Sequence, residues 1–274
     1  VVPEELEKII TTLDVPLPDS KEGERLLSLL CRSQNIEIPP EVFQRFVRGA
    51  LGLTEDEIKR MYTRISLAGS HFTEEDLTLQ IDEKRRAIRK NRFLEFWDTN
   101  QLNLEVGGLD NLKRWLKERE LAFHPQAKSY GLPEPKGLFL LGVQGCGKSL
   151  MAKSVAKMWK MPLLRLDVAS VLQADPEEGL RETIKVSESL APAILWIDEL
   201  EKGFSQSSEK AMQGLGTLLT WMQEKQKPIF VVATANEVRE LPPELLRKGR
   251  FDEIFFVDLP DPHERLEILD IHLR

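Results

Sequence analysis

The sequence predicts an α/β protein with a doubly wound parallel sheet, preceded by a small all-helical domain. Three observations lead to this fold class. Apolar runs at 137–141, 163–166, 193–197 and 229–233 alternate with helical stretches, as buried strands covered by helices on both faces do. Residues 1–99 instead show apolar residues at helical spacing and little glycine. A glycine-rich loop also lies directly between the first apolar run and a helix.

Length and composition exclude several classes of protein. The 274 residues are 41% hydrophobic and 30% charged, with a net charge of −7, which predicts about two folded domains rather than a disordered chain. Two cysteines, Cys31 and Cys146, are too few for a disulfide scaffold and are typical of a reducing compartment. No apolar run approaches the ~20 residues of a membrane helix, and no signal peptide is visible at Val1. We therefore expect a cytoplasmic protein with no membrane span.

Helix signals fill the first part of the chain. Apolar spacing predicts helices over 22–31 and 41–51, and capping boxes at 54–57 and 73–76 begin two more. We expect the last of these to run into Arg92. The basic run from Lys84 to Arg92 is interpreted as the solvated face of that helix. A nucleic-acid contact is the alternative, which the net negative charge disfavours.

A short internal repeat indicates two related modules. Val15–Asp19 leads into an apolar helix, and Val257–Asp261 leads into a similar one with nearly the same letters. Chance similarity of two short Pro-Asp helix starts is the alternative. We interpret residues 1–99 as the tail of one module, 100–262 as a large α/β domain, and 263–274 as the start of a second helical domain.

The strongest chemical signal is the loop from Gly142 to Ser149, which fits the pattern G-x-x-x-x-G-K-[ST]. It follows an apolar run and opens a helix over 150–159, the context that this pattern requires. Glycines let backbone N–H groups turn toward phosphate oxygens, and a helix N-terminus favours negative charge. Lys148 is expected to bridge the β- and γ-phosphates, and Ser149 to ligate Mg²⁺. Cys146 is interpreted as a small residue that fits this loop, with a redox role as the alternative.

Polar residues follow two more apolar runs. Asp198 and Glu199 end the run 193–197; Asp198 can hold the magnesium shell, and Glu199 can deprotonate the attacking water. Asn236 ends the next run and can position water or sense the γ-phosphate. Arg247 and Arg250 flank a glycine and can reach the γ-phosphate of a neighbouring subunit. Taken alone, the two acids are ordinary residues at the end of a strand, the asparagine is a turn former, and the arginines are surface cations. Found together after a phosphate-binding loop, these residues favour nucleotide hydrolysis.

In this order the motifs resemble those of the AAA ATPases. The matching segments are 147–149 (GKS), 197–199 (IDE), 233–236 (ATAN), 247–252 (RKGRFD) and 259–262 (LPDP). The resemblance covers roughly residues 104–274. It implies a P-loop NTPase fold with ATP and Mg²⁺ as cofactors. It also implies a homo-oligomeric ring, a hexamer, in which Arg247 and Arg250 act in trans.

The same resemblance implies the contacts to the nucleotide. Val106, Gly107 and Gly108 resemble the family's entry segment, whose backbone lines the adenine site, and His272 resembles a histidine that packs near the adenine and ribose. The implied phosphate contacts are Gly142, Val143, Gln144, Gly145, Cys146, Gly147, Lys148, Ser149 and Leu150. The implied catalytic residues are Glu199, Lys148, Asn236, Arg247 and Arg250, with Ser149 and Asp198 as metal ligands.

Finer features resemble one branch of the family. Segments 191–204, 219–225 and 241–250 are similar to AAA proteins of cyanobacteria and algal plastids, the family called hypothetical chloroplast reading frame forty-six. That family pairs a degenerate amino-terminal AAA-like module with an active second one, so residues 1–99 are interpreted as the lid of the degenerate module. The resemblance implies a cytoplasmic or plastid-stroma location and a link to photosynthesis or carbon use.

The work that the ATPase performs has more than one interpretation. Residues 172–178 lie in the family's pore-loop region but contain no aromatic residue, which threading AAA motors use to grip polypeptide. Remodelling or regulation of an unknown protein client is the first hypothesis. An ATP-dependent scaffold or switch without threading is the alternative, and a nucleic-acid-associated ATPase is the least supported. The resemblance also implies a second lid with a phosphate-sensing arginine, of which we expect only the start within these 274 residues.

Overall fold

The chain forms two compact units, which divide between residues 83 and 84. The computed structural model describes residues 17–67, 72–73, 76, 79, 85, 88, 91–98, 104–123, 127, 129–174, 176–203, 209–247 and 249–274. The first copy of the repeat before Leu17, most of the expected helix from Thr73 to Arg92, and most of the basic run lie outside these residues. Each unit is described by itself below.

The first unit contains three helices, α1 (Ser20–Gln34), α2 (Pro40–Ala50) and α3 (Glu55–Leu67). Local signals fix their ends. The Asp19 side chain accepts the amide of Glu22 at the start of α1, and Thr54 and Glu57 form the expected capping box before α3. The apolar faces meet in a core of Leu27, Phe46, Val47, Ile58, Met61, Tyr62, Ile65 and Phe72. These helices confirm the expected helical region.

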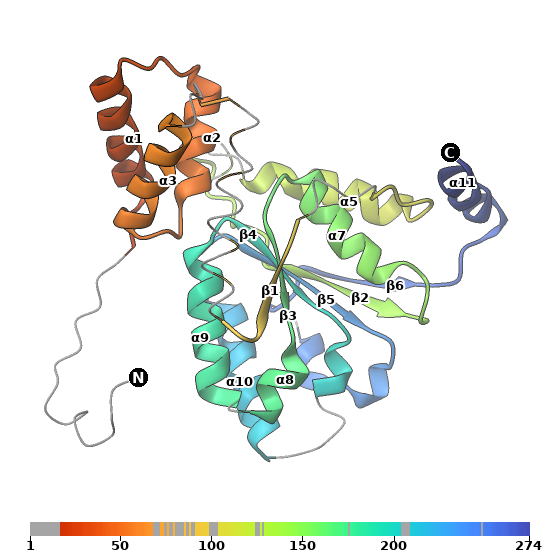
Figure 1. The fold of residues 1–274 in the computed structure, drawn as a ribbon. Helices are drawn as coiled ribbons and strands as arrows, with labels where there is room; N and C mark the ends of the chain where they lie inside the picture. The colour runs from red at the N-terminus through yellow and green to blue at the C-terminus, as the bar shows by residue number, and fades with distance from the viewer. Residues whose placement is uncertain are drawn as a thin grey trace, which may run out of the picture. The chain divides into compact units, whose positions relative to one another are not determined.

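The second unit contains a six-stranded sheet in the order β1-β3-β4-β5-β2-β6 (Figure 1). The strands are β1 (Leu94–Trp97), β2 (Gly137–Gly142), β3 (Leu163–Leu166), β4 (Ala193–Ile197), β5 (Ile229–Ala235) and β6 (Glu253–Val257). Neighbouring strands from β3 to β6 are parallel, and β1 pairs with β3 in the antiparallel direction. The predicted fold class is therefore confirmed, because the four expected apolar runs are all parallel strands.

Two strands differ from the sequence prediction. The segment 94–97, which we expected within the helical region ending at 99, is strand β1 of the α/β sheet. Strand β6, at 253–257, was not expected either. Both strands lie at the edges of the sheet and expose part of their residues, so neither shows the continuous apolar run of a strand buried on both faces.

Helices cover both faces of the sheet, as Figure 1 shows. The core of one face gathers side chains of α5 (Asp110–Glu120) and α7 (Lys148–Met158), and the core of the other gathers those of α8 (Val168–Gln173), α9 (Pro176–Ser189) and α10 (Glu209–Glu224). Ring contacts reinforce the α7 face, where Trp159 packs edge-on against Phe230 at 4.5 Å between centroids. Because helices cover both faces of the sheet, polar side chains gather at the carboxyl edge of the strands.

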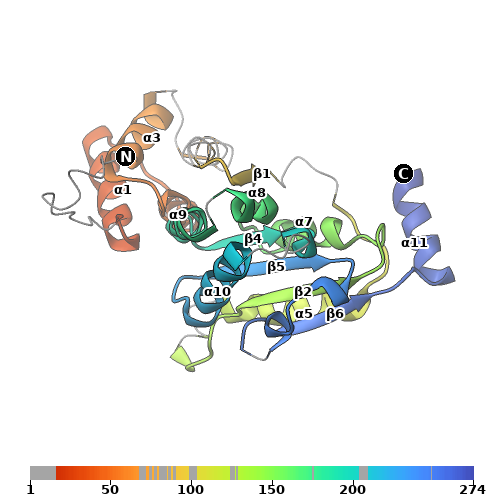
Figure 2. The ribbon, with the colours of Figure 1, turned by 90° about the horizontal axis from the view of Figure 1, so that it is seen from below.

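Short helices and one terminal helix complete this unit. The 3₁₀ segments are η1 (Leu121–Phe123), η2 (Leu200–Gly203), η3 (Val238–Glu240) and η4 (Pro243–Leu246). Helix α11 (Pro262–Leu273) begins with a capping box between Asp261 and Glu264 and lies beyond the end of β6 (Figure 2). In the described part of the chain, no helix is long and apolar enough to cross a membrane.

Candidate nucleotide-binding and hydrolysis site

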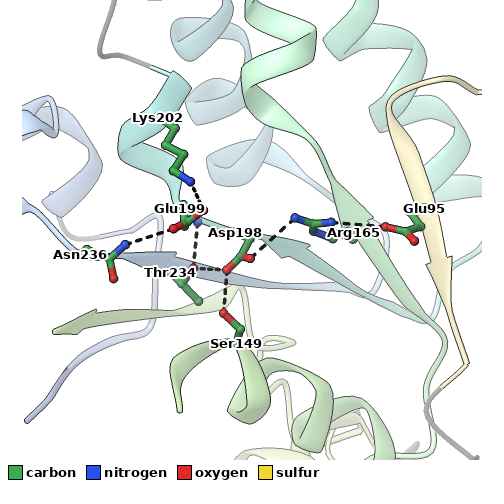
Figure 3. Close-up of polar contacts among 8 residues, drawn as sticks. All are labelled: Glu95, Ser149, Arg165, Asp198, Glu199, Lys202, Thr234 and Asn236. Carbon is green, nitrogen blue, oxygen red and sulfur yellow. Dashed lines mark hydrogen bonds and ion pairs between the residues drawn. The ribbon is translucent and has the colours of Figure 1, made fainter. Parts of the chain in front are cut away.

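The carboxyl ends of three adjacent strands bring the predicted site residues together (Figure 3). Strand β5 lies between β4 and β2, with Ile197 level with Ala233 and Leu141 level with Ala235. The glycine-rich loop leaves β2, Asp198 and Glu199 leave β4, and Asn236 leaves β5. Because parallel strands end at one edge of a sheet, motifs far apart in the sequence meet there.

Glycines set the path of the loop between β2 and α7. Gly142, Gly145 and Gly147 have φ angles of 151°, 84° and 85°, which side chains rarely adopt. At Gly142 space also forbids a side chain, because an added Cβ would lie 1.9 Å from the carbonyl oxygen of Val257 on β6. The loop therefore needs glycine for two physical reasons, backbone conformation and close packing against the next strand.

Lys148 begins α7 and turns back under the loop. Its buried ammonium donates to the carbonyl oxygens of Gly142 at 2.8 Å and Val143 at 2.7 Å. Cys146 is half-buried and packs against the core of the α7 face. The loop thus presents a cation and the start of a helix at one place, which is what an anionic phosphate requires.

Ser149, Asp198 and Thr234 form a chain of hydrogen bonds across three elements. The Ser149 hydroxyl donates to Asp198 Oδ1 at 3.0 Å, and the Thr234 hydroxyl donates to the same oxygen at 2.8 Å. Thr234 Oγ1 also accepts the amide of Glu199 at 3.0 Å. The two predicted magnesium ligands therefore lie within hydrogen-bond distance of each other. Thr234 was not among the predicted site residues.

The donor set fits magnesium. A hydroxyl and a carboxylate are hard oxygen ligands, and Mg²⁺ is usually held by one or two protein oxygens together with water and substrate phosphates. Within the described ranges, no group of three or more His, Cys, Asp or Glu side chains could hold a metal ion. Ser149 and Asp198 beside a phosphate loop match the sparse protein shell that magnesium uses.

Glu199 is held from several sides. Its backbone has a left-handed φ of 50°, a conformation that costs a non-glycine residue about 1–2 kcal/mol. The Lys202 ammonium forms an ion pair with Oε2, and Asn236 Nδ2 lies 3.5 Å from Oε1. Asn236 is held more closely by Glu201, whose Oε1 accepts both the Asn236 amide and Nδ2 at 2.9 Å. Sequence reasoning assigned no role to Glu201 or Lys202.

Arg165 connects Asp198 to the edge of the sheet (Figure 3). One guanidinium nitrogen lies 3.8 Å from Asp198 Oδ2, and the other lies 3.4 Å from Glu95 Oε2 on β1. The guanidinium also lies over the ring of Trp196 at 5.3 Å. Asp198 therefore presents one oxygen to hydroxyl groups and the other to a cation.

The two predicted trans-acting arginines lie after η4. Arg247 is exposed, and Arg250 is half-buried directly after Gly249, which has a φ of 99°. One terminal nitrogen of Arg250 is buried without a hydrogen-bond partner among the residues that the structure describes. In that part of the chain, neither arginine joins the hydrogen-bond network around Asp198 and Glu199.

The predicted adenine segment is held by α11. The amide of Gly108 donates to Glu267 Oε2 at 2.7 Å, and that of Leu109 donates to Glu264 Oε1 at 3.1 Å. An added Cβ on Gly107 would lie 2.8 Å from Ile268. His272 is exposed about one turn farther along the helix. Glu264 and Glu267 were not predicted, because their contacts join segments about 155 residues apart.

Comparison with known families identifies this arrangement. Residues 138–259 match the ATPase family associated with various cellular activities (AAA), and residues 20–91 match the second domain of SpoVK-like AAA ATPases. The chain belongs to the AAA ATPase family. The predicted resemblance is thereby confirmed.

Relatives named as AAA domain-containing proteins match the chain along its whole length. An uncharacterized AAA domain-containing protein ycf46 from Trieres chinensis is 44% identical over 281 residues, covering 100% of this chain and 56% of the relative. The ycf46 protein of Pyropia yezoensis is 43% identical over 280 residues, covering 99% and 57%. A proteasome-activating nucleotidase from Thermococcus kodakarensis is 35% identical over 185 residues, covering 62% and 47%. The chain spans a little over half the length of the ycf46 relatives.

Proposed function

We propose that this AAA protein hydrolyses ATP with Mg²⁺ at the carboxyl edge of its sheet. The observation that carries this proposal is the chain of hydrogen bonds from Ser149 through Asp198 and Thr234 to Glu199. It ties the predicted metal ligands to the predicted base, beside a loop that presents backbone amides and Lys148. A carboxylate next to a phosphate loop is the arrangement that activates water for attack on a γ-phosphate.

Each residue has a defined role in this proposal. The loop from Gly142 to Leu150 binds the phosphates, with Lys148 contacting the β- and γ-phosphates. Ser149 and Asp198 hold Mg²⁺, which when bound neutralises charge that develops on the phosphate oxygens. Glu199 accepts the proton of the attacking water, and Asn236 orients that water or contacts the γ-phosphate.

The adenine is proposed to lie against the turn Val106–Leu109. Gly107 and Gly108 allow α11 to pack closely on this turn, and α11 fixes the turn through Glu264 and Glu267. His272, at the end of α11, is proposed to pack near the base and ribose. This proposal places nucleotide between the α/β domain and the segment 263–274, which we interpret as the start of a second lid.

Wild-type protein and a Lys148→Ala variant test this activity. We expect magnesium-dependent release of phosphate from ATP by the wild type, abolished by excess chelator and restored by added Mg²⁺. Lys148→Ala should lose most ATP binding, measured with a fluorescent ATP analogue, because the buried cation is removed. Wild-type protein that binds no ATP, or hydrolyses it equally well in chelator, would contradict the proposal.

We infer that the active unit is a homo-oligomeric ring, a hexamer, in which Arg247 and Arg250 complete a neighbour's site. The support is the AAA family, whose members commonly form hexamers, together with the position of both arginines outside the network around Glu199. Specific ATPase activity should rise with protein concentration and then saturate. Adding excess Arg250→Ala subunits should lower wild-type activity. Activity independent of concentration in a protein that sizes as a monomer would overturn this inference.

The assembled ATPase is proposed to remodel or regulate a protein partner. The alternative, an ATP-dependent scaffold or switch without threading, is favoured by one observation: α8 ends at Gln173, α9 begins at Pro176, and this junction carries no aromatic residue. ATP-dependent unfolding of a tagged client would support remodelling, and assembly changes without unfolding would support the switch. Binding of nucleic acid, the least supported role, would show a steep salt dependence.

Location and pathway rest on the resemblance to the ycf46 relatives. We propose a place in the cytoplasm or plastid stroma and a link to photosynthesis or carbon use. A fluorescent fusion in the native cell tests the location, and its accumulation outside both compartments would contradict the proposal. Growth of a deletion strain under low and high inorganic carbon tests the link, which equal growth in both would contradict.

A further inference from the structure

Both carboxylate oxygens of Glu199 face a donor group. Lys202 Nζ pairs with Oε2, and Asn236 Nδ2 lies 3.5 Å from Oε1, as Figure 3 shows. The backbone is fixed as well, since φ is 50° and the amide donates to Thr234. A carboxylate that accepts a proton from water must direct a lone pair at that water. In the arrangement observed, Lys202 occupies one of the two oxygens that could do so.

The position of Lys202 follows from the local backbone. The segment after Glu199 turns into η2, and the amide of Lys202 donates to the carbonyl oxygen of Glu199 at 2.9 Å. This turn places the two side chains three residues apart on the same side. The ion pair raises the pKa of Lys202, first through the hydrogen bond with Glu199 and then through the charges of Glu199, Glu201 and Asp198. Lys202 therefore stays charged throughout the physiological pH range.

We propose that Lys202 is a positioning residue that restrains Glu199 and thereby holds down the basal rate of ATP hydrolysis. The inference rests on the proposed role of Glu199 as the base. Release of the ammonium from the carboxylate would precede proton transfer, so loss of Lys202 would accelerate hydrolysis. No covalent step is added: the water proton still goes to Glu199, and Lys202 keeps its own protons.

The exposure of the pair limits the size of the effect. The Lys202 side chain is 63% exposed and that of Glu199 is 31% exposed, and ion pairs in such places are weak and screened by salt. Removing the cation should therefore raise kcat by about two- to fivefold rather than by orders of magnitude. Raising the salt concentration should mimic part of this increase in the wild type.

A different role for Lys202 predicts the opposite result. An ammonium close to Glu199 could instead contact the γ-phosphate, as a tethered cation that stabilises the transition state. Its loss would then lower kcat and weaken binding of ATP relative to ADP. The two roles are separated by the sign of the change in rate and by the binding of nucleotide, which does not depend on turnover.

The experiment compares the wild type with Lys202→Gln, Lys202→Arg and the control Lys117→Gln, which removes a charge from an exposed position on α5. Initial ATPase rates are measured at saturating Mg-ATP between 50 and 500 mM KCl. We expect Lys202→Gln to be about two- to fivefold faster at 50 mM, with a flatter salt dependence than the wild type. Lys202→Arg and Lys117→Gln should behave like the wild type.

Equilibrium binding supplies the readout that is independent of activity. The affinities of Lys202→Gln for ATP and ADP, each measured in a Glu199→Gln background, should change by less than about twofold because the restraint acts on the carboxylate. An unchanged or slower Lys202→Gln, or a selective loss of ATP affinity, would overturn the proposal. Failure of the proposed function itself would appear differently, as undiminished hydrolysis by Glu199→Gln alone.

Discussion

The hydroxyl of Thr234 donates to Asp198 Oδ1 at 2.8 Å and accepts the backbone amide of Glu199 at 3.0 Å. One buried side chain thus fixes both the proposed metal ligand Asp198 and the backbone amide of the proposed base Glu199. Its position on β5, the strand beside β4, allows it to reach the residues that follow β4. This contact couples the geometry of the two acids.

Thr234→Val should therefore damage both stability and activity. The substitution keeps the shape but leaves the Glu199 amide without its partner, which should lower the free energy of unfolding by about 1–3 kcal/mol. Misplaced acids should lower kcat by about tenfold or more. Urea unfolding and phosphate release measure the two effects, and Thr234→Ser, which keeps the hydroxyl, is the control. Full activity in Thr234→Val would show that the contact does not position the acids.

Gly142 and Gly145 should respond very differently to alanine. Gly142→Ala places a Cβ 1.9 Å from the backbone oxygen of Val257, a clash that separation of β2 from β6 alone can relieve. We expect a loss of stability of about 3 kcal/mol or more. Gly145→Ala meets no atom within 4 Å, so it carries only the strain of its φ angle, about 1–2 kcal/mol. Thermal unfolding of both variants checks this order, and equal losses would contradict it.

Glu267→Ala should weaken binding of the nucleotide base selectively. Loss of the charged hydrogen bond to the Gly108 amide should loosen the turn Val106–Leu109 and raise the Kd for ATP by about tenfold. The Kd for inorganic tripolyphosphate, which lacks a base, should not change. Asp270→Ala on the same helix is the control, and Glu267→Gln, which keeps an acceptor oxygen, should restore most of the affinity. Equal weakening of both ligands would contradict a role at the base.

Lys225 gives the stability a specific pH dependence. Burial lowers its pKa to about 8 in the folded protein, against about 10.4 when unfolded. Between these pH values the unfolded chain binds more protons than the folded protein, so the free energy of unfolding rises with pH across this window. Below pH 8 the folded protein carries the full free-energy cost of burying the charged lysine.

Lys225→Met tests this dependence. The variant should be more stable than the wild type at pH 7, by about 1–2 kcal/mol after loss of the hydrogen bond to Ile229. Its advantage should shrink or disappear at pH 10, where the wild-type lysine is largely neutral. Lys227→Met, at an exposed neighbouring position, controls for the added apolar surface. An equal advantage at both pH values would show that charge burial is not the cause.

Local patterns in the sequence predicted several of the residues that the structure brings together in the candidate site. The loop from Gly142 to Ser149 is contiguous, and Asp198 and Asn236 each follow a buried apolar strand. Their proximity follows from one geometric rule, since parallel strands end at a common edge. The four central strands were also predicted, because burial on both faces gives each of them an apolar run.

The parts that were missed depend on contacts between distant segments. Thr234 is a polar residue within the apolar strand IFVVATA, and this was the one signal that could have identified it. Arg165 and Lys202 are ordinary surface cations in the sequence, and only the paired strands and the turn into η2 bring them to Asp198 and Glu199. Strands β1 and β6 were not predicted because edge strands lack the continuous apolar run of a strand that is buried on both faces.

The most direct test of the central claim separates binding from turnover in Glu199→Gln. The wild type and this variant are compared by equilibrium binding of ATP and by single-turnover release of phosphate. We predict that Glu199→Gln binds ATP within about threefold of the wild type and releases phosphate at least about 100-fold more slowly, because the amide cannot accept the proton of water. Phosphate release at the wild-type rate, with binding intact, would contradict hydrolysis by Glu199 at this site.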